Sequence, residues 1–303
     1  MILHLFMILS FFMNTYNNYL LNAFHFRGIH CFCKTSPILP KREIAYYSGK
    51  DKNSSLYTNN RHLITISPGG FKGFWMLGVS AYIKEHYASY LTNCSYSGAS
   101  AGSWIALFMT FKGDDKQFIS NIIDDEINRL KIINEIKYRI KHKILSSYNE
   151  SNFDLSKIYI GVYSLQEYKL MTHIYSKFDN LEDVLECCIA SSHIPFITGG
   201  MTQKYHDIVS YDGGFSKYPY TNFTKPILHI TSDMFSKNAV LVKRRGILES
   251  IYYTPLFARE KYNFTHLFHQ GYQDAEFHKE YLDTIFYSIH KNKEIDTNNN
   301  RKI

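Results

Sequence analysis

The order of apolar runs and glycine-rich turns predicts an α/β fold with a mainly parallel central sheet. Residues 63–66 form a short apolar run that ends in a Pro-Gly-Gly turn, as a buried strand does. Residues 74–90 then carry apolar side chains at helical spacing. The same order repeats with a second short strand expected at 94–98 and a largely apolar helix at 101–111. Alternating strands and helices are typical of a parallel sheet covered by helices.

Downstream segments extend this pattern. Residues 158–165 and 227–231 are further strand candidates, and residues 181–190 are expected to be helical. The stretch 116–144 is amphipathic with charges on one side, which favours a solvated helix over the sheet rather than a binding role. Residues 259–290 are predicted to be helical and are rich in aromatic residues and His.

These patterns divide the chain into three sections. Residues 1–60 combine an apolar N-terminal segment with a polar lead-in, in which we expect little regular structure over 27–60. Residues 61–258 form the globular domain, and 259–303 a helical C-terminal extension. The apolar residues 1–13 fall short of the ~20 that span a bilayer. Signal peptide, membrane anchor and translation artefact stay open for them, and we otherwise favour a cytoplasmic or peripherally membrane-associated protein.

Composition narrows the function classes. The chain has 303 residues, a net charge of +7 and 45% hydrophobic residues, which is enough for a sizeable core. No compact basic patch with interleaved aromatic residues indicates a nucleic-acid partner. The five Cys residues include no C-x-x-C pair, so neither a disulfide framework nor a structural zinc site is expected.

The sequence G-x-S-x-G at residues 98–102 marks the first candidate site. It follows a strand-like run and precedes an apolar helix, which is the setting of a nucleophile elbow. Gly98 and Gly102 allow a sharp turn, and the helix N-terminus favours negative charge near Ser100. The alternative is a small-residue turn in which Ser100 only caps the helix.

The glycine-rich turn at residues 68–73 is the second candidate. Backbone N–H groups at a helix start can form an oxyanion hole, where one donor is worth roughly 3–4 kcal/mol. Pro68 has no N–H, so the candidate donors are Gly69, Gly70 and Phe71. Lys72 is either a contact for an anionic head group or an ordinary exposed lysine.

Asp212, in a Tyr-Asp-Gly-Gly segment, is the candidate base. Alone, this segment would be read as a tight turn. A serine nucleophile requires a base, which is often a His. His266, His269, His278 and His290 all fall in the helical tail without a glycine-rich loop to present them, and we interpret them as helix-surface or core residues. A Ser-Asp-His triad stays open as an alternative.

Together these motifs resemble the patatin-like phospholipase family. The glycine turn, the G-x-S-x-G and the Asp-Gly-Gly occur in the family's order, and residues 190–196 are similar to its segment after a sheet-backing helix. The resemblance covers roughly 62–230, with 271–275 as an extension, and Pro68 replaces a usual glycine. It implies a three-layer α/β/α fold with no metal and no cofactor. The motif glycines are Gly73, Gly98, Gly102, Gly213 and Gly214.

The resemblance also implies the chemistry: Ser100 attacks an ester carbonyl and Asp212 accepts its proton. The expected function is a lipid acyl hydrolase, phospholipase A-like or acylglycerol lipase, acting at a membrane or lipid-droplet surface. The alternative is a catalytically silent lipid-binding or structural protein. Aromatic and apolar residues near the motifs are candidates for an acyl-chain groove, although core packing is favoured for most of them: Phe71, Phe74, Trp75, Ile194, Phe196 and Phe215.

Overall fold

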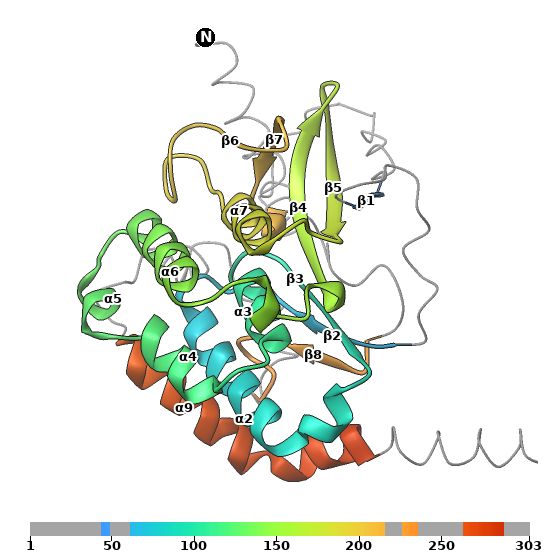
Figure 1. The fold of residues 1–303 in the computed structure, drawn as a ribbon, viewed down its shortest axis with the longest axis vertical. Coiled ribbons are helices and arrows are strands. Elements are labelled where there is room, and N and C mark those ends of the chain that lie inside the picture. Colours follow the sequence, from blue (N-terminus) through green and yellow to red (C-terminus); the bar gives the residue numbers. More distant parts are fainter. Residues whose placement is uncertain (1–43, 49–60, 216–225, 236–262, 288–303) are drawn as a thin grey trace, which may run out of the picture.

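The computed structural model describes residues 44–48, 61–215, 226–235 and 263–287 (Figure 1). These residues form an α/β fold with a mixed, mostly parallel sheet, which confirms the predicted fold class at this level. The strands are β1 (Ile44–Ser48), β2 (His62–Ile66), β3 (Cys94–Gly98), β4 (Ile158–Gln166), β5 (Lys169–Ser176), β6 (Gln203–Tyr205), β7 (Ile208–Tyr211) and β8 (Leu228–Ile230). The described α-helices are α2 (Gly73–Leu91), α3 (Ala101–Thr110), α4 (Asp115–Ile122), α5 (Asp125–Arg129), α6 (Ile133–Ser147), α7 (Leu181–Ser191) and α9 (Phe264–Phe277).

The middle of the sheet sets the position of both glycine-rich turns. The strand order is β1-β5-β4-β3-β2-β8. Strand β3 runs parallel to both of its neighbours, β2 and β4. Gly98 at the end of β3 pairs with Ile66 at the end of β2. The carboxyl ends of both strands therefore lie at the same edge of the sheet, where open α/β folds bind their ligands.

β7 carries Asp212 to the same region from far along the chain. It runs antiparallel to β4, with Tyr211 opposite Tyr163. The next residues pack tightly on β4, since a Cβ on Gly213 would lie 2.2 Å from the carbonyl oxygen of Gly161. Ile160, the neighbour of Gly161, is the β4 partner of Gly98. This register places Asp212 close to the turn that follows β3.

A close crossing joins α2 and α9, which lie side by side in Figure 1. A Cβ on Gly271 would lie 1.9 Å from the carbonyl oxygen of Trp75, and one on Gly78 would lie 2.0 Å from that of Phe268. The Trp75 indole N–H donates a 2.8 Å hydrogen bond to Asp274 across the crossing. Because Gly78 and Gly271 have no side chains, α9 packs directly against the backbone of α2, the helix that follows the glycine-rich turn.

Several local predictions were wrong. The stretch 116–144 is divided among three helices, α4, α5 and α6. Asp124 caps the start of α5 by accepting a hydrogen bond from the Ile127 N–H. The apolar side of the stretch also lines a cavity, so it is more than a solvated cover. The expected unstructured lead-in contains β1, which pairs in parallel with β5, a strand that the sequence analysis missed.

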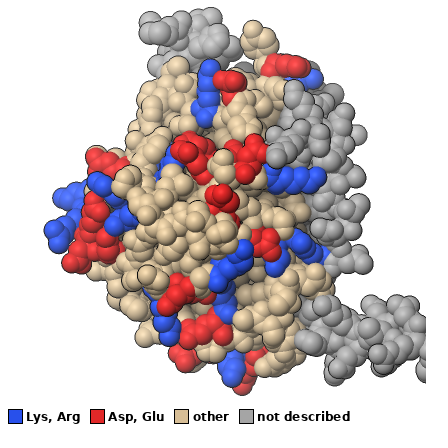
Figure 2. Space-filling model, in the orientation of Figure 1, with Lys and Arg blue, Asp and Glu red and all other residues tan. Residues whose placement is uncertain are grey.

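Other predictions fall partly outside the described residues. Helix α9 and the helical residues 279–287 occupy most of the segment expected to be helical, whereas 1–13 lies outside the described ranges. Within those ranges, no helix combines the length and apolar character needed to cross a bilayer. On the face shown in Figure 2, basic and acidic side chains are interspersed, so the net charge of +7 is not gathered there.

Candidate active site

Ser100 occupies a strained turn between β3 and α3. Its φ of 53° and ψ of −127° lie outside the regions that non-glycine residues normally adopt. Strained backbone of this kind persists only where the surrounding structure enforces it, and it gathers at functional sites. A serine held in this conformation between a strand and a helix has the geometry of a nucleophile elbow.

The two glycines of the motif make the tight turn possible. A Cβ on Gly98 would lie 2.1 Å from the carbonyl oxygen of Gly102, and one on Gly102 would lie 2.3 Å from that of Ile66. Ser191 locks the turn further, since its Oγ accepts a 2.8 Å hydrogen bond from the Ser100 N–H and donates one of 2.7 Å to the Gly161 carbonyl. The elbow is thereby tied to both neighbouring strands.

The structure brings Asp212 into direct contact with Ser100. The Ser100 hydroxyl donates a 2.7 Å hydrogen bond to Oδ2 of Asp212 across 112 positions of sequence. The other oxygen, Oδ1, accepts a 2.7 Å hydrogen bond from the Gly214 N–H, and the Asp212 N–H donates to the His193 carbonyl at 2.6 Å. Both Ser100 and Asp212 are buried. The carboxylate is therefore held in one orientation, with one oxygen directed at the hydroxyl.

Burial raises the pKa of Asp212 to about 6. Desolvation is the main cause, and it is opposed by the hydrogen bonds from Ser100 and Gly214 and by the positive charge of Lys137. A carboxylate with this pKa is a stronger base than an exposed Asp and remains largely ionised at neutral pH. The pair can thus serve as nucleophile and general base.

The glycine-rich turn lies beside this pair. Gly70 has a φ of 52°, in the left-handed region that favours glycine, and both Gly70 and Phe71 line the same cavity as Ser100. Gly69 lies outside that lining, where a Cβ would meet Met76 at 2.5 Å. Hydrogen bonds inside the turn use the N–H of Lys72. Of the three predicted donors, Gly70 and Phe71 are thus the ones at the cavity.

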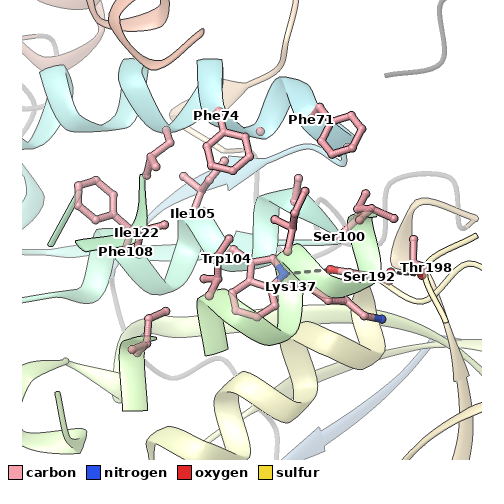
Figure 3. Close-up of a pocket in the computed structure, with 18 of the residues that line it drawn as sticks. Phe71, Phe74, Ser100, Trp104, Ile105, Phe108, Ile122, Lys137, Ser192 and Thr198 are labelled. Carbon is pink, nitrogen blue, oxygen red and sulfur yellow. Dashed lines mark hydrogen bonds between the residues drawn. The ribbon is translucent and has the colours of Figure 1, made fainter. Parts of the chain in front are cut away.

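An apolar cavity opens from the Ser–Asp pair (Figure 3). It encloses about 120 Å³, well above the ~10–15 Å³ that one water requires. Its polar lining is confined to a few groups, including Ser100, Lys137, Ser192, Thr198 and Asp212. Its apolar walls come from the turn before α2 and from helices α2, α3, α4 and α6: Phe71, Phe74, Leu77, Trp104, Ile105, Phe108, Phe118, Ile122, Ile133, Ile136, Ile140 and Ile144. A lining of this composition suits a hydrocarbon chain better than a polar ligand.

Lys137 is a site residue that the sequence analysis missed. It lies on α6, is 5% exposed and lines the cavity. Its Nζ has no hydrogen-bond partner among the described residues. The signal was a charged residue inside the apolar stripe formed by Ile133, Ile136, Ile140 and Ile144.

Other candidate residues lie away from the cavity. Lys72 is not part of its lining, and neither are Trp75 and Phe196, the latter 66% exposed. The expected groove residues Ile194 and Phe215 also lie outside it, whereas Phe71 and Phe74 are on its walls. The tail histidines do not reach it either: His266 and His269 are exposed, His278 bonds the Asp274 carbonyl, and His290 is outside the described residues.

Comparisons with known proteins add no name to this site. No protein-family model matches the chain, and no curated protein matches it in sequence. Across the described ranges, no cluster of three or more His, Cys, Asp or Glu residues is placed to hold a metal ion.

Proposed function

We propose that this protein is a lipid acyl hydrolase that cleaves fatty-acyl esters with Ser100 as nucleophile and Asp212 as base. The observation that carries the proposal is the 2.7 Å hydrogen bond from the Ser100 hydroxyl to the buried Asp212 carboxylate, in the wall of an apolar cavity. The resemblance to patatin-like phospholipases supports it, and the three-layer arrangement with a helical C-terminal extension belongs to the same proposal.

The reaction follows from the positions of these groups. Asp212 takes the hydroxyl proton as Ser100 Oγ attacks the ester carbonyl, and the N–H groups of Gly70 and Phe71 stabilise the oxyanion. The proton then passes from Asp212 to the departing alcohol as the acyl-enzyme forms. Water attacks this ester in turn, gives its proton to Asp212, and the fatty acid leaves while the proton returns to Ser100.

The cavity supports a lipid as the substrate. Its walls are almost entirely apolar, and its Ser100 end would hold the ester. We propose a membrane or lipid-droplet surface as the source of the substrate, for a protein that is cytoplasmic or peripherally associated with membranes. Mass spectrometry of the products formed from a mixed lipid extract would distinguish phospholipase from acylglycerol lipase activity.

Two alternatives make different predictions. A Ser-Asp-His triad requires a His at the pair, whereas Asp212 contacts Ser100 directly and the described tail histidines lie outside the cavity. A catalytically silent lipid-binding protein has no need of a strained serine turn or of a base held by two further hydrogen bonds. Both features favour the enzyme.

Turnover of a short-chain nitrophenyl ester tests the proposal. We expect Ser100→Ala to abolish hydrolysis and Asp212→Asn to slow it by about 100-fold or more, while the circular dichroism spectrum of each stays unchanged. Ser89→Ala, an exposed serine on α2, is the matched control and should retain full activity. Hydrolysis near the wild-type rate in either site variant would refute the dyad.

A further inference from the structure

Lys137 places an ammonium group inside a cavity whose walls are mostly apolar. The side chain is 5% exposed and its Nζ makes no hydrogen bond with any described residue. Nζ lies over the Tyr138 ring, 5.4 Å from its centroid. Burying an amine without a partner is unfavourable, because it loses its hydration and gains nothing in return. A bound ligand with an acceptor for the ammonium group would offset this cost.

The surroundings of Lys137 indicate what that partner is. Nζ is aimed along the cavity toward the end where Ser192 and Thr198 lie (Figure 3). Glu186 and Asp212 act on it only through longer-range charge interactions, and no ion pair joins it to a described carboxylate. Lys141, one turn further along α6, is by contrast paired with Glu182 and Glu186. The lysine that faces the cavity is thus the one left for a ligand.

We propose that Lys137 is an anion-recognition residue, which selects lipids carrying a negatively charged oxygen group at the end of the hydrocarbon chain held in this cavity. A phosphate of a head group and the carboxylate of a fatty acid share this chemistry. The inference rests on the proposed lipid-binding role of the cavity, but it does not require turnover. Apolar walls hold the chain, and the ammonium group forms a charge-assisted hydrogen bond to its anionic end.

The charge state of Lys137 is compatible with this role. Desolvation lowers its pKa to about 8, and the charges of Asp212 and Glu186 oppose that change. The neighbouring His193 has its pKa lowered to about 4, first by burial and then by Lys137, so it is neutral at pH 7. Lys137 therefore remains mainly protonated at pH 7. The preference for anions should weaken as the pH rises above about 8.

Binding of three single-chain ligands to the full-length protein tests the proposal without catalysis. Dodecanoate, dodecyl phosphate and dodecanol share one chain length and contain no ester. Calorimetric titration below the micelle concentration measures each dissociation constant. We expect at least one of the two anions to bind about tenfold or more tightly than the alcohol, as one charge-assisted hydrogen bond allows. If dodecyl phosphate binds more tightly, the recognised group is a head-group phosphate; if dodecanoate does, it is a fatty-acid carboxylate.

Two variants complete the test. Lys137→Met keeps an unbranched, flexible side chain that is one heavy atom shorter, and it should abolish the preference for anions. Lys141→Met removes an equal charge from the same helix and should leave the preference intact. Equal binding of anions and alcohol to the wild-type protein, or a preference that survives Lys137→Met, would overturn the proposal. If none of the three ligands binds, this inference also falls. Nitrophenyl-ester turnover with its Ser100 dependence then decides separately whether the hydrolase proposal stands.

Discussion

Asp212 combines burial with a fixed orientation, and both are needed for a carboxylate to act as a base without a histidine. Burial raises its pKa to about 6, whereas the hydrogen bonds from Ser100 and Gly214 limit that rise. An exposed Asp, with a pKa of ~3.9, would be a much weaker base. The Ser100 hydroxyl and the Gly214 N–H therefore favour the ionised carboxylate, while burial raises its pKa and makes it a stronger base.

Asp212→Asn is expected to keep the shape of the site and remove the base. The amide cannot accept the Ser100 proton, so kcat/KM should fall by roughly 10²–10⁴-fold, the usual contribution of a general base. The Gly214 N–H can still donate to the amide oxygen, so thermal unfolding should change little. Kinetics on a nitrophenyl ester together with a melting curve would check both parts.

The pH dependence should report the same carboxylate. Asp212 must be deprotonated to accept a proton, so kcat/KM should rise with pH and level off above about 6. The positive charge of Lys137 lowers the pKa of Asp212, so Lys137→Met should move this acid limb to higher pH. A profile that stays flat from pH 4 to 8 would contradict the assignment of the base.

At the scale of elements, the crossing of α2 and α9 holds the glycine-rich turn in place. We expect Gly271→Ala to force the helices apart, since the new Cβ would meet the Trp75 carbonyl oxygen at 1.9 Å. Overpacking of this kind typically costs about 1–3 kcal/mol in the free energy of unfolding. Urea unfolding would measure the loss.

Gly200→Ala is the matched control for that substitution. A Cβ at Gly200 would find no atom within 4 Å, and its φ is not positive. The variant should unfold at the wild-type urea concentration or slightly above it, because Ala restricts the unfolded chain. Equal destabilisation by both substitutions would show that the helix crossing is not the cause.

Helix boundaries show where the sequence reasoning was limited. Strand β2 could be predicted because an apolar run ends there in a glycine-rich turn, and β3 because a short segment leads into the G-x-S-x-G turn and an apolar helix. Helix α7 could be predicted because its apolar spacing is regular. The break between α4 and α5 was missed, although Asp124 is a good capping residue, because the amphipathic pattern continues across it. β5 was missed because Lys169 and His173 interrupt its apolar pattern.

At the scale of the whole molecule, the sheet brings the Ser100 and Asp212 side chains into contact, whereas the sequence shows only that each lies in a motif. Ser100 and Asp212 could be predicted because each lies in a recognisable glycine-flanked turn. Lys137 was missed, because its place in the apolar stripe of α6 indicates that it faces inward but not that it faces a cavity formed by other helices. Such residues become visible only when the packing of α3, α4 and α6 is known.

The most direct test of the Ser–Asp hydrolase is the site at which a fluorophosphonate reacts with the full-length protein. Phosphonylation requires a serine activated by a base, and peptide mass spectrometry locates the adduct. The account predicts one adduct on Ser100 that disappears in Ser100→Ala and forms much more slowly in Asp212→Asn. An unlabelled wild-type protein, or an adduct on another residue, would contradict it.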